Sequence, residues 1–180
     1  MNIIEELVKK YDEKYSEEPG KASNMINGRF TFQPQSGKIE INGTKISVNI
    51  NAVGGAAQTA EPYRIVLHLE KNYKKQLEIF PKTHLKRFLD LFKANNSAIQ
   101  SNLVNKKYSF SGDKQLISNL RLDRKFCKNI QDEKLYILIG KKYPKRIVLT
   151  PAFGVEDIEH FEKLILILKL IEEKIKHNCT

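Results

Sequence analysis

The sequence is poor in the residues that mark disulfide-stapled or fibrous proteins. It has no tryptophan, two cysteines, nine glycines and six prolines among 180 residues. Two cysteines exclude a disulfide framework, and so little glycine and proline excludes a collagen-like or low-complexity chain. A hydrophobic fraction of 41% is too high for a disordered polymer. The composition therefore predicts a folded globular protein.

Long hydrophobic runs and a secretory leader are also missing. The longest apolar run, Leu164 to Leu168, has five residues, whereas a membrane-spanning helix needs about 20. The acidic pair Glu5 and Glu6 stands where a leader would carry positive charge. We therefore expect a cytoplasmic protein without membrane insertion, whose thiols stay reduced.

Groupings that could carry catalysis or bind a metal are scarce. No cysteine or histidine pair has the spacing of zinc ligands. Glu156 and Asp157 lie four and three residues before His160, so on a helix they could share its face. Di-iron bundles use such a step, but they need a second copy that this chain does not contain. We interpret the segment as the acidic first turn of a helix and predict no metal, no cofactor and no catalytic residue.

Positive charge is in excess and is concentrated in the middle of the chain. The net charge is +10, and residues 71–146 alone carry 19 basic against 6 acidic side chains. Such a field attracts phosphates, nucleic acid or anionic surfaces. Only six of the 31 basic residues are arginines, and lysine is the weaker choice for bidentate contacts. A surface that only keeps the protein in solution is therefore the alternative interpretation.

Basic residues stand beside tyrosines at three places in this middle segment. The candidate polyanion-binding residues are Tyr73, Lys74, Lys75, Lys106, Lys107, Tyr108, Lys141, Lys142, Tyr143, Lys145 and Arg146. A strand surface holds single-stranded nucleic acid in this way, with lysines for phosphates and tyrosines for stacking. The same residues also suit a purely structural role, because lysines protect sheet edges from aggregation and tyrosine is a common strand residue.

The first half of the chain is predicted to form a helix followed by a sheet. Apolar residues at helical spacing over 3–15 predict a long N-terminal helix. Alternation of apolar and polar residues then predicts three consecutive antiparallel strands at 28–34, 37–42 and 44–50. Asn42-Gly43 predicts a tight hairpin between the last two, because both residue types tolerate positive φ.

A stretch of small residues, 51–62, interrupts this pattern. It is long for a loop inside a compact domain. We expect one domain, 1–180, and this stretch is the place for a weak division within it. Gly54 and Gly55 could admit the close approach of a ligand, although the lysine of a phosphate-binding loop is missing. The stretch is thus a possible ligand loop.

The second half is predicted to alternate strands and helices. Asp113 and Asp123 are expected to cap two short helices. The other expected elements are strands at 63–70, 77–80 and near 107–111, a helix at 82–94, a hairpin of 135–139 with 146–150, and a helix at 155–177. The fold class is therefore α+β: a largely antiparallel sheet of about 7–8 strands, a long helix at each end and about three shorter helices. Two small sheets, one in each half, are the alternative.

The order of predicted elements is distinctive from Glu61-Pro62-Tyr63-Arg64 onward. It continues with Leu77-Glu78-Ile79-Phe80-Pro81-Lys82 and Lys107-Tyr108-Ser109-Phe110-Ser111-Gly112-Asp113, followed by a short leucine-rich helix, a hairpin and a C-terminal helix. This order, over roughly the last two-thirds of the chain, resembles several bacterial domain families of unknown function, found alone or next to membrane spans. The resemblance implies a soluble α+β domain and assigns no catalytic residue.

The C-terminal helix carries the last functional signal. Its apolar residues extend nearly all round the helix, so it must be buried on more than one side. It can lie across the domain's own sheet or pack on a twin in a homodimer. We predict a non-enzymatic protein-interaction or self-association module. The alternative is binding of nucleic acid or another polyanion through 71–146, and an enzyme of unrecognised type is third.

Overall fold

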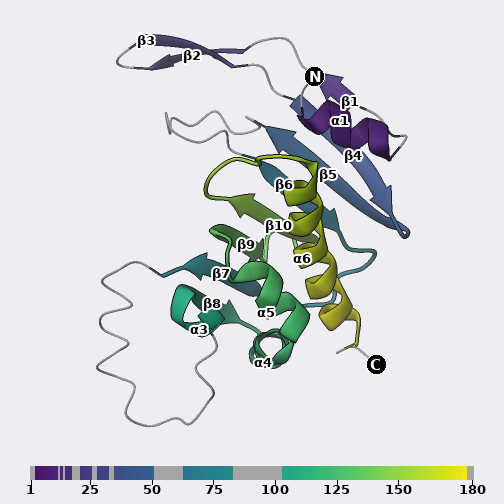
Figure 1. The fold of residues 1–180 in the computed structure, drawn as a ribbon, viewed down its shortest axis with the longest axis vertical. Coiled ribbons are helices and arrows are strands. Elements are labelled where there is room, and N and C mark those ends of the chain that lie inside the picture. Colours follow the sequence, from purple (N-terminus) through teal and green to yellow (C-terminus); the bar gives the residue numbers. More distant parts are fainter. Residues whose placement is uncertain are drawn as a thin grey trace.

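The computed structural model describes residues 3–11, 13, 15–17, 21–25, 28–32, 35–50, 63–82 and 103–177. In these residues the chain forms the predicted α+β fold (Figure 1). The elements are α1 (Ile3–Lys10), β1 (Tyr15–Glu17), β2 (Lys21–Met25), β3 (Gly28–Phe32), β4 (Gln35–Ile41), β5 (Thr44–Ile50), β6 (Arg64–His68), β7 (Leu77–Pro81), α3 (Leu103–Lys107), β8 (Tyr108–Gly112), α4 (Lys114–Leu122), α5 (Arg124–Ile130), β9 (Leu135–Ile139), β10 (Arg146–Pro151) and α6 (Ile158–His177).

Seven strands, β4 to β10, form one continuous antiparallel sheet, as predicted. Their order is β4-β5-β6-β10-β9-β7-β8, and the three-residue β1 adds to the edge at β4. Because β6 pairs with both β5 and β10, the sheet joins the two halves of the chain. The alternative of one small sheet in each half is therefore wrong.

The predicted run of three strands is correct only for its last pair. β4 and β5 pair across Asn42 and Gly43, whose φ angles of 50° and 74° confirm the tight hairpin. β3, however, pairs with β2 in a separate two-stranded sheet. The first three residues of β4 pair with β1, so the edge that the prediction gave to 28–34 is already taken.

The N-terminal helix is short, contrary to the prediction. It ends at Lys10, and the amide groups of Tyr11 and Glu13 both donate to the Val8 carbonyl oxygen. Tyr15, expected on the helix, lies in β1 opposite Gly37. Strand pairing thus competes with helix extension here and prevails, because pairing fills the edge of the sheet.

The C-terminal helix α6 is long, as predicted, and begins at Ile158. Asp157 precedes it and accepts a hydrogen bond from the His160 amide at 2.7 Å. Nine of its residues are buried against β6, β10 and the other helices. Among its large hydrophobic residues Leu166 stands out as 46% exposed. The helix thus completes the core of its own domain.

The two predicted helix caps in the second half are confirmed. Asp113 Oδ1 accepts from the Leu116 amide at 2.8 Å, and Asp123 Oδ1 accepts from the Phe126 amide at 2.9 Å. The hairpin of β9 with β10 is also confirmed. The predicted helix at 82–94 lies mostly, and the loop 51–62 entirely, outside the described residues.

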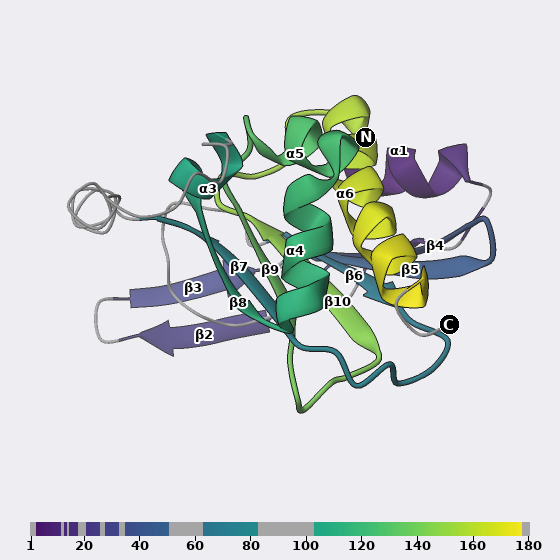
Figure 2. The ribbon, with the colours of Figure 1, turned by 90° about the horizontal axis from the view of Figure 1, so that it is seen from below.

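The helices α1, α4, α5 and α6 all lie on one side of the sheet (Figure 2). Inward-pointing strand residues such as Ile46, Leu67 and Leu149 form a single apolar core with them. The other side of the sheet carries no helix among the described residues. None of the helices in the described part of the chain is long and apolar enough to cross a membrane.

Candidate functional site

The face of the sheet that points away from the helices is here called the outer face. Side chains alternate along a strand, so residues between the buried ones point to this side. Its side chains are Lys38 and Glu40 of β4, Lys45, Ser47 and Asn49 of β5, Arg64, Val66 and His68 of β6, Arg146, Val148 and Thr150 of β10, Tyr136 and Leu138 of β9, and Glu78 of β7.

Cations from four neighbouring strands gather on the outer face. The strand register brings Lys45 close to His68, and His68 is paired directly with Arg146. Lys38 is paired with Ser47 on the adjoining row, and Arg64 is paired with Asn49. Lys45 and Arg146 lie on either side of His68, and Arg64 is four residues away along β6, so the positive charges are distributed over one face of the sheet.

The centre of the outer face is apolar. Val66 is only 7% exposed, whereas Leu138 and Tyr136 of β9 are 45% and 52% exposed. Val148 lies between Val66 and Leu138, since it is paired with both. An exposed aromatic ring on the face that carries the cations offers a stacking surface for a flat ligand.

Ser47 and His68 form a hydrogen bond at the basic end of this face. Ser47 Oγ and His68 Nε2 are 2.8 Å apart. The pKa of the His68 imidazole is lowered, first by burial and then by the charges of Arg146, Lys38 and Lys45. His68 is therefore neutral near pH 7, and its ring lies in a field set by three cations.

A hollow of about 500 Å³ opens beside this pair. It is lined by Glu13, Lys38, Ile39, Glu40, Lys45, Ile46, Ser47 and His68. Glu40 is paired with Lys45 across β4 and β5, which balances part of the charge. The charges that lower the pKa of His68 are those of Arg146, Lys38 and Lys45, so positive charge lies near the histidine end of the hollow.

Two of the three predicted basic–tyrosine groups lie at the same end of the sheet. The Leu69 amide donates to the Lys145 carbonyl oxygen at 2.8 Å, and Leu77 is paired with Ile139. The loop holding Tyr73, Lys74 and Lys75 therefore runs alongside the turn holding Lys141, Lys142, Tyr143 and Lys145. Arg146 connects this end to the outer face.

Side chains within these two groups differ in what they can offer a ligand. Tyr143 is 50% exposed, with Lys142 Nζ at 5.4 Å and Arg146 Cζ at 5.1 Å from its ring centre. Lys75 forms a largely buried ion pair with Asp113 at 3.0 Å. Tyr73 packs against the core. Lys142, Tyr143 and Arg146 are thus the accessible part of the prediction, together with Lys74, Lys141 and Lys145.

The third predicted group, Lys106 to Tyr108, lies at the opposite end of β7, where Tyr108 is paired with Pro81. Tyr108 is buried, and its hydroxyl donates to the Glu133 carbonyl oxygen at 2.6 Å. Burial raises the pKa of this phenol. Lys107 Nζ donates to the Gln131 carbonyl oxygen at 2.6 Å. Tyr108 and Lys107 therefore hold the fold together here, and only Lys106 is exposed.

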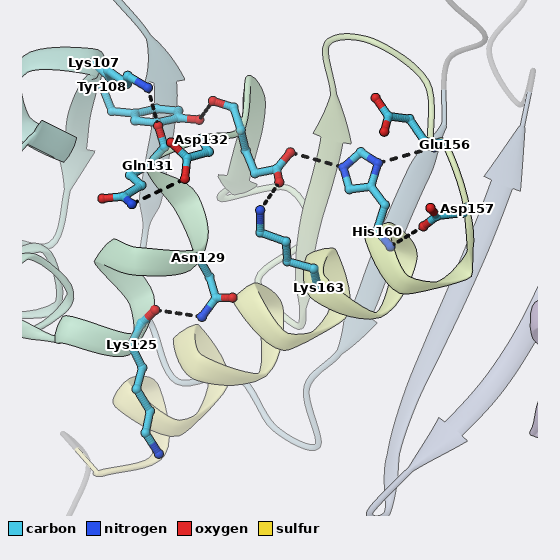
Figure 3. Close-up of polar contacts among 11 residues, drawn as sticks. Lys107, Tyr108, Lys125, Asn129, Gln131, Asp132, Glu156, Asp157, His160 and Lys163 are labelled. Carbon is cyan, nitrogen blue, oxygen red and sulfur yellow. Dashed lines mark hydrogen bonds and ion pairs between the residues drawn. The ribbon is translucent and has the colours of Figure 1, made fainter.

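The acidic segment before α6 forms a structural network (Figure 3). The Glu156 amide donates to His160 Nδ1 at 3.3 Å, and His160 Nε2 lies 3.1 Å from Glu133 Oε2. Lys163 Nζ pairs with the other oxygen of Glu133 at 2.6 Å. These contacts tie the start of α6 to the segment before β9. No group of three or more metal-ligating side chains that could hold an ion occurs in the described ranges.

The basic residues of the outer face were missed by the sequence analysis. Lys38, Lys45 and Arg64 stand on strands that were correctly predicted to have one polar face. Only the strand order brings them onto the same face as Arg146, which is far away in the sequence. Gly54 and Gly55, the possible ligand loop, lie outside the described residues.

No protein-family model, curated protein sequence or solved structure matches this chain. The resemblance of residues 61–113 and the elements after them to bacterial domain families stays a prediction. Function must therefore be argued from the geometry of the outer face alone.

Proposed function

We propose that this protein is a non-enzymatic binding module that holds single-stranded nucleic acid across the outer face of its sheet. The observation that carries the proposal is that four adjacent strands each place a cation, Lys38, Lys45, Arg64 and Arg146, on the same face of the sheet. Cations in such an array neutralise successive phosphates, and this supplies most of the affinity of a non-specific binder.

The exposed aromatic ring of Tyr136 adds a second element of such a surface. Its ring is 52% exposed on β9, beside strands that carry the cations. Every base has a π-face, so stacking on tyrosine tolerates any sequence and contributes about 1–3 kcal/mol per base. A single-stranded nucleic acid running from Arg146 towards Tyr136 would place its phosphates at the basic end of the outer face and its bases over the centre.

Lysines and tyrosine at the adjoining end of the sheet extend the same surface. The turn between β9 and β10 carries Lys141, Lys142 and Tyr143, all exposed. This turn is joined through Arg146 to the outer face. The exposed residues of the β9–β10 turn and the outer-face cations missed from sequence thus extend one basic region, which does not include the predicted group Lys106 to Tyr108.

A protein partner is the second candidate, and one observation favours it. Leu138 is 45% exposed and contributes hydrophobic surface beside Tyr136 and Val148 on the outer face. Aromatic and aliphatic side chains at the centre of a patch, with charges around it, are typical of protein interfaces. The predicted self-association through α6 has less support, because α6 is buried in its own core.

The test is binding of a fluorescent single-stranded oligonucleotide, measured by anisotropy between about 50 and 200 mM salt. We expect affinity to fall steeply with salt. The double variant Lys45→Gln/Arg64→Gln should weaken binding and reduce the slope of log affinity against log salt by about 1.4, since each lost contact to single strands contributes about 0.7.

The matched control carries the same change of charge on the helical side. Lys114→Gln/Lys128→Gln replaces two exposed lysines of α4 and α5 and should leave the slope unchanged. Equal weakening by both double variants would mean that only net charge matters. No binding at low salt would overturn the proposal and leave the protein partner as the better candidate.

A further inference from the structure

We infer that the hollow beside Ser47 and His68 is a phosphate site that receives the terminal phosphomonoester of the bound strand. The inference rests on the proposed function, because it assigns one subsite of the outer face. It names a ligand chemistry, a dianionic phosphate, that free phosphate and the end of a nucleic acid share. The experiment below separates these two sources.

The geometry of the hollow supports a built anion site. Hydrogen-bonding groups come from β5 and β6, where Ser47 Oγ lies 2.8 Å from His68 Nε2. Positive charges line the hollow from β4 and β5, through Lys38 and Lys45, and Arg146 of β10 stands beside it as the register partner of His68. Four strands of a rigid sheet therefore fix the five groups relative to one another, which lowers the entropy cost of binding a small anion.

The electrostatics of His68 agree with a site for an anion. The pKa of His68 is lowered, first by burial and then by the charges of Arg146, Lys38 and Lys45, so the neutral imidazole is surrounded by positive charge. A phosphate bound beside the ring would offset their charges and favour the imidazolium form. By linkage, phosphate binding should raise the pKa of His68.

Two carboxylates give a reason why the phosphate is terminal. Glu13 and Glu40 line the same hollow on the side of β4, near the edge of the sheet. These carboxylates repel phosphates beyond the hollow on the β4 side. We therefore expect a nucleic-acid strand that enters from the β10 side to end in the hollow. A phosphomonoester also carries about −1.5 to −2 charges near pH 7, whereas each backbone phosphate carries one. The phosphomonoester is therefore attracted more strongly to the cations in and beside the hollow.

The first experiment uses the full chain and inorganic phosphate, with the ring of His68 followed by NMR during pH titrations. The expected result is an upward shift of the His68 pKa when phosphate is added. Chloride at equal ionic strength is the control, because a pKa shift caused by salt screening alone would also appear with chloride. If phosphate leaves the titration of His68 unchanged, the inference is overturned.

The second experiment compares three oligonucleotides of one sequence, with a 5′-phosphate, a 3′-phosphate or hydroxyl groups at both ends. We expect one phosphorylated form to bind at least about tenfold tighter than the hydroxyl form, which is about 1.4 kcal/mol. Ser47→Ala and His68→Asn should each reduce this preference, whereas Lys128→Gln on α5 should keep it. Circular dichroism of each variant checks that it folds.

The outcomes separate this inference from the proposed function. Oligonucleotides that bind equally well with and without a terminal phosphate, together with an unmoved His68, would reject the subsite but keep the nucleic-acid surface. Inorganic phosphate that shifts His68 while no oligonucleotide binds would reject the proposed function and leave a site for a small phosphorylated molecule. The wild-type titration alone decides the phosphate site, even if a variant does not fold.

Discussion

Single residues determine how closely the N-terminal helix can approach the sheet. Gly37 of β4 lies directly under α1, so that a Cβ atom added there would come within 2.6 Å of Val8 Cγ2 and 2.8 Å of Ile4 Cγ2. Such distances are far shorter than van der Waals contact. Glycine is thus required at this position by a close approach of two elements.

The substitution Gly37→Ala tests this close packing. We expect it to lower the free energy of unfolding by about 1–3 kcal/mol, the usual cost of overpacking a core, as measured by urea denaturation. Gly140→Ala is the matched control, because its Cβ would meet only the Leu138 side chain, at 3.8 Å or more. A stability equal to wild type in Gly37→Ala would mean that α1 is not held against β4.

At the scale of elements, a buried carboxylate joins α6 to the β4–β5 hairpin. Glu172 is 3% exposed and accepts hydrogen bonds from the Thr44 hydroxyl at 3.1 Å. Lys169 and Lys176 pair with it at 2.8 and 2.9 Å. A buried charge without partners is costly, so the full set of partners is what makes this arrangement stable.

Removing the charge should weaken this junction. Glu172→Gln takes the buried carboxylate away from Lys169 and Lys176, of which Lys176 keeps the exposed Glu70 at 3.5 Å, and we expect a loss of about 1–3 kcal/mol in the free energy of unfolding. Glu173→Gln is the matched control, since the neighbouring side chain is 55% exposed and forms a long ion pair with His177 at 3.9 Å. A similar loss in both variants would contradict the assignment.

The same carboxylate predicts how stability depends on pH. Burial by itself would raise the pKa of Glu172, but hydrogen bonds and charges of Lys169 and Lys176 outweigh burial and hold it below its ordinary 4.5. Because the folded pKa is the lower one, the stabilisation is present above about pH 4.5 and is lost as pH falls through the folded value. Glu172→Gln should therefore lose less stability than wild type on acidification, in urea unfolding series from about pH 7 to about pH 3.

At the scale of the whole molecule, α6 buries most of its apolar residues within its own domain. Ile167 is fully buried, whereas its neighbour Leu166 is 46% exposed. The sequence predicts only that this helix, apolar nearly all round, can pack on a twin, and does not distinguish these two residues. Contacts with the sheet and with α1, α4 and α5 account for the apolar surface of the helix.

The two neighbours therefore make a sharp pair of substitutions. Ile167→Glu buries an unpaired charge and should cost about 4 kcal/mol or more, measured by thermal or urea unfolding. Leu166→Glu should cost less than about 1 kcal/mol, as usual for surface positions, and should leave the mass in solution unchanged by light scattering. A fall in mass caused by Leu166→Glu would indicate a dimer through this helix.

Local patterns in the sequence were sufficient for the elements whose stabilising contacts are local. The Asn42-Gly43 turn, the caps at Asp113 and Asp123 and the β9–β10 hairpin involve residues close together in the chain, so their residue types specify them directly. The length of α1 could not be obtained in this way, because the pairing of β1 with β4 competes with the helix.

By itself, then, the sequence determined the α+β class, the long C-terminal helix and a basic middle segment, all of which follow from periodicity and composition. Only the tertiary structure decided which strands are neighbours, that Tyr108 is buried, and that Lys45, His68 and Arg146 meet on one face. The physical reason is that sheet pairing joins residues about 80 positions apart, and no local preference encodes such a choice of partner.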